Sequence, residues 1–221
     1  MIIKEMTKGI NDPPYVKYLV RLTRPFPDFD FYFIKPVRKK AIKLLDLKNG
    51  DRVIDAGCGS GGSFPFILNG IGQTGELIGV EISPSTTINT HKRIAKNHWK
   101  NVIIFEADAQ NVTLSGKFDD LLMFAAPDVF ASEKALSNIL PYLKENARVV
   151  FFGAKISDKK YGCILNGLIR LAFTKLSFQS TPVLESKPWT IIEKHLENLV
   201  VEEYFFGWMF LANGSFKSLD K

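Results

Sequence analysis

Cysteine and histidine are scarce in this chain of 221 residues, which has two cysteines, Cys58 and Cys163, and three histidines. Two cysteines are too few for the disulfide framework of a small secreted domain, so the sequence favours a reducing cytoplasm. Because there is no run of about 18 or more apolar residues, we expect no membrane-spanning segment. The first residues include an acid and no long apolar core, so we expect no signal peptide.

The chain carries a net charge of +6 and has an isoelectric point of about 9.2. A net positive charge is compatible with binding to a nucleic acid, an anionic membrane surface or an acidic substrate. It is equally compatible with an ordinary solvated basic surface. The basic residues are spread along the chain, and their longest run is Arg38-Lys39-Lys40. Charge alone therefore does not select a partner.

No residues in the sequence show the spacing of a metal site or of a catalytic triad. The histidines, His91, His98 and His195, fall in or near predicted helices and belong to no motif. Each is expected to be a surface or core residue. The sequence therefore nominates no metal ligand, and it leaves the catalytic residues unassigned.

Short apolar segments alternate with helical segments after the first 34 residues. The predicted strands are residues 52–55, 77–81, 101–105, 120–124 and 148–152, and the predicted helices are 36–45, 85–97, 131–145 and one that ends near residue 68. Near-continuous apolar strands between helices are typical of a parallel sheet covered on both faces. Residues 199–205 and 208–212 leave no room for a crossover helix, so they are predicted to pair as an antiparallel hairpin. The predicted fold class is α/β, with a Rossmann-like, seven-stranded, mostly parallel sheet, a C-terminal antiparallel hairpin and helices on both faces.

Residues 1–34 stand apart from this alternation. They are irregular and rich in aromatic side chains, among them Phe29, Phe31 and Tyr32. We expect them to form an aromatic lid over a ligand-binding site, because segments that close over a site exclude water from it. Residues 35–221 are expected to form one α/β domain, since a chain of this length is in the usual range for a single core.

A glycine-rich loop follows the first predicted strand and opens a helix. It reads Asp55-Ala56-Gly57-Cys58-Gly59-Ser60-Gly61-Gly62, and its glycines allow tight backbone geometry and close approach of a ligand. Gly57, Gly59 and Gly62 also satisfy the pattern of a dinucleotide-binding loop. The glycines alone therefore leave three interpretations open: a nicotinamide or flavin site, a purely structural turn, and a site for another nucleoside cofactor.

Two acids bear on that choice. Asp55 stands two residues before the first glycine, where a carboxylate can face an ammonium group, and S-adenosylmethionine has an α-amino group where a dinucleotide has pyrophosphate. Glu81 ends the next predicted strand, where it can accept hydrogen bonds from both ribose hydroxyls, although a dinucleotide site also wants an acid there. A chain this short leaves little room for the separate substrate domain of a nicotinamide or flavin enzyme. Asp55 and the length of the chain favour S-adenosylmethionine, whereas Glu81 fits both kinds of cofactor.

The segment from Val53 to Gly61 resembles motif I of the class I S-adenosylmethionine-dependent methyltransferases, and the resemblance covers about residues 35–214. It implies that residues 35–221 bind this cofactor, that Glu81 holds the ribose and that Asp108 meets the adenine amino group. Residues 118–124 resemble the family's fourth-strand motif, which ends beside the methyl group at Phe124. The cofactor-binding set implied by the resemblance is Asp55, Gly57, Cys58, Gly59, Gly61, Glu81, Ile82, Asp108, Ala109 and Phe124.

Three flanking stretches are similar to bacterial phosphatidylethanolamine-type and related small-molecule methyltransferases: residues 32–38, 187–189 and 205–208. This similarity implies a small-molecule acceptor, and in its finer form the amine headgroup of a lipid. Residues 159–178 have an apolar helical face with Arg170 and Lys160 outside it and Lys175 within it, which suits peripheral contact with an anionic membrane or packing on the sheet.

Two alternatives stay open beside the small-molecule enzyme. One is an RNA or protein methyltransferase, which the basic charge permits. Nucleic acid is the less expected partner because the chain has no added RNA-binding domain. The other is a protein that binds S-adenosylmethionine without catalysis, since the acids and glycines indicate binding more directly than they indicate reaction.

Overall fold

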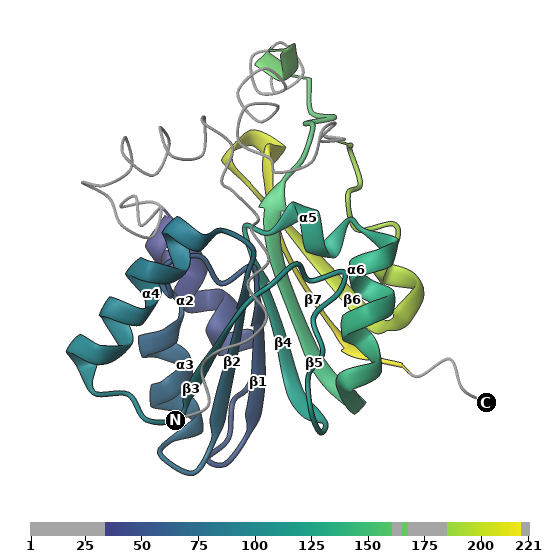
Figure 1. Ribbon diagram of the computed structural model, residues 1–221. Coiled ribbons are helices and arrows are strands. Elements are labelled where there is room, and N and C mark those ends of the chain that lie inside the picture. The colour runs from purple at the N-terminus through teal and green to yellow at the C-terminus, as the bar shows by residue number, and fades with distance from the viewer. Residues whose placement is uncertain (1–33, 161–164, 168–184, 218–221) are drawn as a thin grey trace.

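The computed structural model describes residues 34–160, 165–167 and 185–217 (Figure 1). Among these residues one seven-stranded sheet has the order β3-β2-β1-β4-β5-β7-β6. Its strands are β1 (Arg52–Ala56), β2 (Glu76–Glu81), β3 (Val102–Glu106), β4 (Phe118–Phe124), β5 (Leu143–Ala154), β6 (Leu196–Tyr204) and β7 (Met209–Phe216). Strands β1 to β5 pair in parallel, and β7 is antiparallel to both β5 and β6. The predicted sheet and its antiparallel hairpin are confirmed.

Helices cover both faces of the sheet, as predicted (Figure 1). One face carries α2 (Ile34–Leu44), α3 (Phe64–Ile71) and α4 (Pro84–Asn97), and the other carries α5 (Pro127–Phe130) and α6 (Glu133–Ile139). Alternate residues of a strand point to opposite faces. Accordingly Leu121 and Met123 of β4 enter the core under α5 and α6, whereas Leu122 and Phe124 enter the core under α2 and α3.

The helix predicted at residues 131–145 is wrong at its C-terminal end. The helix α6 ends at Ile139, a short 3₁₀ helix η1 (Leu140–Tyr142) follows, and β5 already begins at Leu143. Pro141 explains the difference, because proline removes a backbone donor and its ring clashes with the preceding helical turn. The early part of β5 then pairs with β4 at Phe118.

The end of the chain forms a longer hairpin than the sequence predicted. A 3₁₀ helix η3 (Ile192–His195) leads into β6, and a tight 3₁₀ turn η4 (Phe205–Gly207) connects β6 to β7. Beside this hairpin, the Trp189 ring lies 4.9 Å from the Phe210 ring, centroid to centroid, in the core under α5 and α6.

Several predictions concern residues beyond the described ranges. The lid proposed for residues 1–34 is described only at Ile34, which belongs to α2. The helix predicted at residues 159–178 is described only at residues 159–160 and 165–167, and Cys163 also lies outside the described residues.

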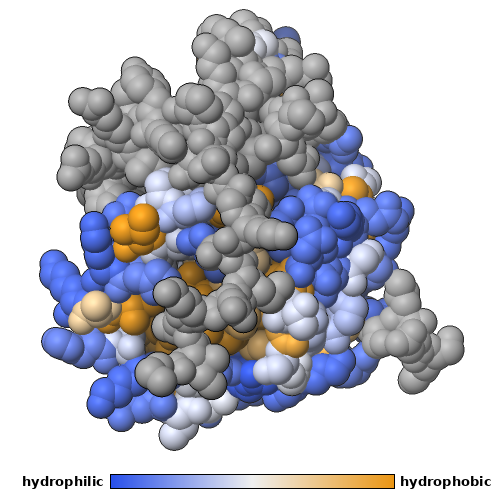
Figure 2. Space-filling view, in the orientation of Figure 1, coloured by the Kyte–Doolittle hydropathy of each residue, from blue (hydrophilic) through white to orange (hydrophobic). Residues whose placement is uncertain are grey.

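The described surface is mainly hydrophilic around the rim of the face shown in Figure 2, with hydrophobic residues gathered toward its middle. Large apolar side chains that are exposed include Ile103 on the edge strand β3, Val200 on the edge strand β6 and Phe206 in η4. Within the described ranges, none of the helices combines the length and the hydrophobicity needed to cross a bilayer.

Candidate functional site

The glycine loop connects β1 to α3 and folds over the end of β2. The amides of Gly57 and Cys58 both donate to the Val80 carbonyl, at 2.8 and 3.1 Å. Gly57 has a φ of +75°, and a Cβ built there would lie 2.5 Å from the Cβ of Ala126, so only glycine fits without a shift of the backbone. Gly59, at φ +55°, has no atom within 4 Å of a built Cβ. The loop therefore packs tightly at its start and opens into free space at its second glycine.

Glu81 holds this open part of the loop. Its Oε2 accepts a hydrogen bond from the Gly59 amide at 2.9 Å, and its Oε1 accepts one from the Ser83 amide at 2.8 Å. The side chain is only 8% exposed. A carboxylate has about four acceptor positions, so two amide bonds leave capacity for further donors such as ribose hydroxyls.

Asp55 lies at the same end of the sheet and is 1% exposed. Neither of its carboxylate oxygens has a hydrogen-bond partner among the described residues. Burial raises the pKa of Asp55 to about 7, against the opposing effect of the Arg38 guanidinium, and the Glu81 carboxylate raises it further. A buried carboxylate without a partner is costly, and an ammonium group bound at the loop would satisfy it. The residues present therefore fit a ligand with an amino group.

Arg38 is a residue of this site that the sequence analysis missed. It lies in α2, is 6% exposed, and donates from Nη1 to the Ser63 hydroxyl at 2.9 Å. Its guanidinium carbon lies 4.2 Å from the centre of the Phe124 ring, within the range of a cation–π contact. The signal was available in the sequence, because Arg38 occupies a position in the buried stripe of α2, which is otherwise formed by Ile34, Val37, Ala41 and Ile42.

The predicted adenine-side residues follow β2 and β3. Asp108 is half-buried, and its Oδ1 accepts a hydrogen bond from the Gln110 amide at 2.9 Å, which fixes the turn after β3. Ala109 is buried, and its carbonyl accepts a hydrogen bond from Asn138 at 3.0 Å. Ile82 is half-buried directly after Glu81. Strands β3, β2, β1 and β4 are neighbours and run parallel. Their carboxyl ends therefore bring the predicted cofactor-binding residues to the same end of the sheet.

Phe124 ends β4 at this edge. Its ring stacks on the Phe152 ring of β5, with centroids 4.5 Å apart and planes inclined by 20°. The next residue, Ala125, has a φ of +61° and donates its amide to the Phe152 carbonyl at 2.8 Å. Both rings are buried in the core that also includes Cys58 of the glycine loop.

The Cys58 thiol and the three imidazoles are the remaining groups that could react. Burial raises the pKa of the Cys58 thiol well above its ordinary value, and the nearby carboxylates of Asp55 and Glu81 act in the same direction. His91 and His98 are exposed on α4 and at its C-terminal cap, and His195 precedes β6. Within the described part of the chain, no cluster of three or more His, Cys, Asp or Glu side chains could hold a metal ion.

A comparison with protein-family models decides the family. The model described as "Methyltransferase domain" matches residues 47–160, which is more than half of the chain. The chain belongs to this methyltransferase family. The match spans the glycine loop, Glu81, Asp108 and β4, and the S-adenosylmethionine cofactor inferred from the sequence is confirmed with it.

Curated relatives of this methyltransferase align over part of their length. Aklanonic acid methyltransferase DauC from Streptomyces sp. is 23% identical over 54% of this chain and 55% of its own. Demethylmenaquinone methyltransferase from Staphylococcus saprophyticus is 28% identical over 48% of this chain and 47% of its own. A 23S rRNA (uracil(1939)-C(5))-methyltransferase from Ralstonia pickettii is 31% identical over 53% of this chain and 28% of its own. The chain thus spans about half or less of the length of these relatives.

Solved structures share the fold more completely. The N-methyltransferase NodS from Bradyrhizobium japonicum, in complex with S-adenosyl-L-homocysteine, superposes with a TM-score of 0.66. That match covers 93% of this chain and 100% of the other at 14% identity. Likeness at this identity establishes the Rossmann-like methyltransferase fold.

Proposed function

We propose that this methyltransferase transfers the methyl group of S-adenosylmethionine to a small molecule with a hydrophobic part. The observation that carries the proposal is the unpartnered, buried Asp55 carboxylate at the end of the sheet where the stacked rings of Phe124 and Phe152 also lie. The first of these features suits the amino group of the cofactor, and the second suits an apolar acceptor. Methyl transfer from a sulfonium is an in-line displacement with a neutral leaving group, so positioning and exclusion of water supply most of the effect.

The proposed cofactor contacts follow from the geometry of the loop. Asp55 accepts hydrogen bonds from the amino group, and the Arg38 guanidinium faces the carboxylate of the same methionine part. Glu81 accepts from the ribose hydroxyls, and the half-buried Asp108 meets the adenine amino group. Gly57, Cys58, Gly59, Gly61, Ile82, Ala109 and Phe124 line the remaining surface. The matching roles in the family are the reason for assigning the last two acids to ribose and adenine.

The acceptor is proposed to lie between Phe124 and the tip of the β6–β7 hairpin. Phe205 and Phe206 in η4 are 37% and 73% exposed, and both have positive φ values, 50° and 58°. The left-handed conformation is unfavourable for a bulky residue, so the rest of the structure must hold the turn. The Phe206 ring also contacts the Trp208 ring, with centroids 6.0 Å apart. The tip thus presents aromatic surface to solvent from a constrained backbone.

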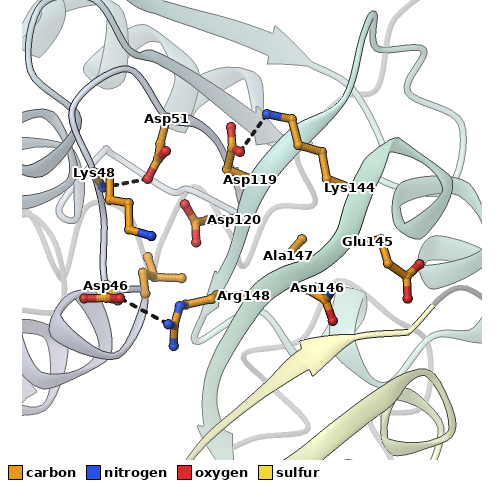
Figure 3. Close-up of a pocket in the computed structure, with 11 residues that line it drawn as sticks. Asp46, Lys48, Asp51, Asp119, Asp120, Lys144, Glu145, Asn146, Ala147 and Arg148 are labelled. Carbon is orange, nitrogen blue, oxygen red and sulfur yellow. Dashed lines mark hydrogen bonds and ion pairs between the residues drawn. The ribbon is translucent and has the colours of Figure 1, made fainter.

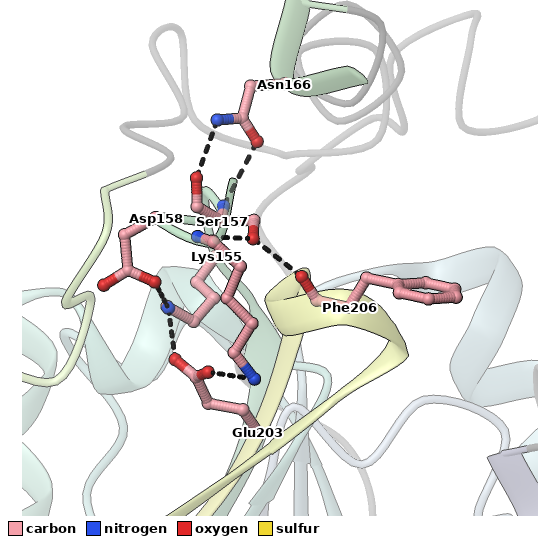
Figure 4. Close-up of polar contacts among 7 residues, drawn as sticks. Lys155, Ser157, Asp158, Asn166, Glu203 and Phe206 are labelled. Carbon is pink, nitrogen blue, oxygen red and sulfur yellow. Dashed lines mark hydrogen bonds and ion pairs between the residues drawn. The ribbon is translucent and has the colours of Figure 1, made fainter. Parts of the chain in front are cut away.

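A polar cluster around the buried Lys155 and Ser157 joins this tip to the segment that follows β5 (Figure 4). Lys155 is 1% exposed, and its Nζ lies 2.5 Å from Oε1 of Glu203. Lys159 pairs with the other oxygen of Glu203 at 2.9 Å, and hydrogen bonds from both lysines hold the pKa of that carboxyl below its ordinary value. Ser157 donates its hydroxyl to the Phe206 carbonyl at 2.7 Å. Only Lys155 and Ser157 of this cluster are buried, and loss of Glu203 would leave the buried Lys155 ammonium without its nearest carboxylate.

Trp189, in the flanking stretch at residues 187–189, lies in the core. It is 9% exposed and packs on Phe210, since residues 187–189 lead the chain into η3 and β6. The apolar wall of the proposed pocket is therefore assigned to Phe205, Phe206 and Trp208. Residues 168–178, part of the predicted apolar helical face, lie outside the described ranges.

The finer form of the proposal is that the acceptor is the amine headgroup of a lipid, reached at the surface of an anionic membrane. It rests on the flanking similarity at residues 205–208 and on the exposed aromatic tip beside Lys159. Residues 1–34 are proposed to close over the cofactor as a lid.

Two of the curated relatives are named for small-molecule acceptors and one for ribosomal RNA. RNA is therefore the alternative acceptor that the experiment must distinguish from a small molecule.

The deciding experiment is transfer of a labelled methyl group from S-adenosylmethionine into separated lipid, small-molecule, RNA and protein pools. Label in the lipid or small-molecule pool supports the proposal, and label in an amine lipid supports its finer form. Label confined to RNA or protein would overturn it while leaving the family assignment intact. Tight cofactor binding with no label in any pool would indicate a protein that binds the cofactor without catalysis.

A further inference from the structure

The three helices on one face of the sheet, α2, α3 and α4, contain no aspartate and no glutamate (Figure 1). They contain eight lysine and arginine residues, five in α2 and three in α4. Subtracting these eight from the 29 basic residues of the whole chain leaves 21, against 23 acidic residues. The positive charge that is spread along the sequence is therefore gathered on one face of the fold.

Lysines line the outer surfaces of α2 and α4. On α2, Lys35, Lys39 and Lys43 are exposed, and their spacing of four residues places them on one side of the helix. On α4, Lys92 and Lys96 have the same spacing and are also exposed. Within the described part of the chain, none of these five lysines forms an ion pair with an acid.

The acids that lie close to α2 have basic partners of their own. Asp46, which follows the helix, pairs with Arg148 at 3.1 Å (Figure 3). Glu202 of β6 pairs with Lys40 at 2.5 Å. These pairs leave the charge of the five exposed lysines uncompensated.

The helix between the two lysine rows carries no charged side chain. Because α3 connects β1 to β2, α4 connects β2 to β3 and α2 packs against β5 and β7, α3 is the middle helix of this face. A groove of about 380 Å³ lies between α2 and α3, and its lining includes Lys39, Lys43, Ile42, Leu47 and Phe66. The Lys39 ammonium lies 6.0 Å from the centre of the half-buried Phe66 ring. An apolar strip therefore adjoins the exposed positive charge.

The arrangement suits an anionic lipid surface better than a nucleic acid. A lipid surface offers anionic headgroups to the lysines on both sides and an apolar layer to the uncharged strip between them. Lysine fits such a surface because its apolar stem lies along it while the ammonium group reaches the headgroups. A nucleic acid would place phosphates over α3 as well, where no cation meets them. The two arginines, which bind phosphate best, are withdrawn, since Arg38 is buried and Arg93 is half-buried.

We propose that the face formed by α2, α3 and α4 binds the surface of an anionic lipid membrane. The lysine rows supply the electrostatic attraction, and the strip along the groove supplies the apolar contact. The proposal does not rest on the acceptor of the methyl group, although it would bring the enzyme to the surface where a lipid acceptor lies. None of the five lysines belongs to the proposed cofactor-binding set, so membrane binding and cofactor binding can be measured separately.

The test is sedimentation of the full chain with lipid vesicles, without S-adenosylmethionine. One set of vesicles is phosphatidylcholine alone, and the other is phosphatidylcholine and phosphatidylglycerol in equal parts. The wild type is expected to bind the anionic vesicles, and added salt should weaken this binding because it screens exposed charges. The triple variant Lys35→Gln, Lys39→Gln, Lys43→Gln should lower the affinity at least about tenfold, since each lysine near an anionic surface adds to the attraction. The double variant Lys92→Gln, Lys96→Gln should lower it in the same direction.

A charge-matched control is the triple variant Lys134→Gln, Lys187→Gln, Lys194→Gln. These lysines are exposed on α6 and around η3, which pack on the other face of the sheet. The control is expected to bind the anionic vesicles as the wild type does. All three variants should keep the wild-type affinity for S-adenosylmethionine, which shows that they are folded.

Three results would overturn the proposal. They are equal binding of the wild type to neutral and anionic vesicles, an equal loss of binding in the α2 variant and the control, and tighter binding to duplex RNA than to anionic vesicles. If the α2 variant does not fold, the α4 double variant carries the test, and unchanged vesicle binding by it would then count against the face. Because no methyl transfer is measured, a negative result here leaves the proposed acceptor as it stands.

Discussion

The amide of Gly59 donates to Oε2 of Glu81 at 2.9 Å, so one carboxylate both fixes the glycine loop and faces the cofactor side of the sheet. We expect Glu81→Ala to weaken S-adenosylmethionine binding by about 1–3 kcal/mol, because charge-assisted hydrogen bonds are lost. Glu76→Ala is the control, since Glu76 lies at the other end of β2 and pairs with Arg52 at 2.6 Å. Titration calorimetry should show a loss only in the first variant. Equal affinity in a folded Glu81→Ala protein would remove the ribose assignment.

The affinity for S-adenosylmethionine should depend on the ionisation of Asp55. The pKa of this carboxyl is raised to about 7, chiefly by burial, whereas its ordinary value is 3.8. The cofactor's ammonium group favours the ionised form, so affinity should rise as the pH increases from about 5.5 to 7.5 and then level off. Asp55→Asn should bind more weakly and lose this rise. Titrations at several pH values test the prediction, and an unchanged pH profile in the variant would contradict it.

Two glycines of one loop should respond differently to alanine. Gly57→Ala places a Cβ 2.5 Å from Ala126, and we expect a loss of stability of about 2–4 kcal/mol from the clash and the positive φ. Gly59→Ala meets no atom within 4 Å, and it should reduce stability by only about 1–2 kcal/mol. If the cofactor approaches the loop at Gly59, that variant should instead lose affinity. Denaturant unfolding and cofactor titration of both variants separate the two effects, and the reverse ranking of stabilities would show the loop geometry to be wrong.

Phe206→Ser should reduce methyl transfer to an apolar acceptor without changing cofactor affinity. The ring is 73% exposed on a turn fixed by Ser157, so its removal should affect stability little. A several-fold rise in KM for the acceptor identified by the labelling experiment is expected. Val200→Ser, which removes another exposed apolar side chain from β6, is the control and should leave KM unchanged. Identical kinetics in both variants would remove the hairpin tip from the acceptor site.

Asp120 should make the protein less stable as the pH rises. Its pKa is raised from 3.8 to about 8, first by burial and then by Asp51 and Asp119. The native state therefore holds a proton that the unfolded chain has lost, and stability from this group declines between about pH 4 and pH 8. Asp120→Asn should be more stable than the wild type by on the order of 1–3 kcal/mol at pH 9, with little difference at pH 4. Unfolding curves at both pH values provide the measurement. A stability difference between the variant and the wild type that stays the same at pH 4 and pH 9 would contradict the raised pKa of Asp120.

The sequence predicted the sheet well because strands and loops leave local signals. Buried strands such as β4 contain an apolar run, here Leu121 to Phe124, and the glycine loop combines Asp55 with a spacing typical of the family. The helix before β5 is shorter than the sequence predicts because Pro141 breaks it. The basic run at residues 38–40 does not by itself indicate that Arg38 is buried. The position of Arg38 in the apolar stripe of α2 does indicate it. The raised pKa of Asp120 could not be predicted from the sequence, since it depends on burial and on which acids near β1, β4 and the end of α2 meet across the sheet.

The position of β7 has a consequence for how this protein is made. The strand lies inside the sheet, between β5 and β6, yet it follows both of them in the chain. While the protein is being synthesised, β5 therefore keeps an open edge, and β6 waits without its partner, until residues 209–216 leave the ribosome. The hairpin can therefore join the parallel part of the sheet only after these residues are available. During that interval, the exposed edge of β5 is the place where a nascent chain of this protein is most vulnerable to pairing with a neighbour.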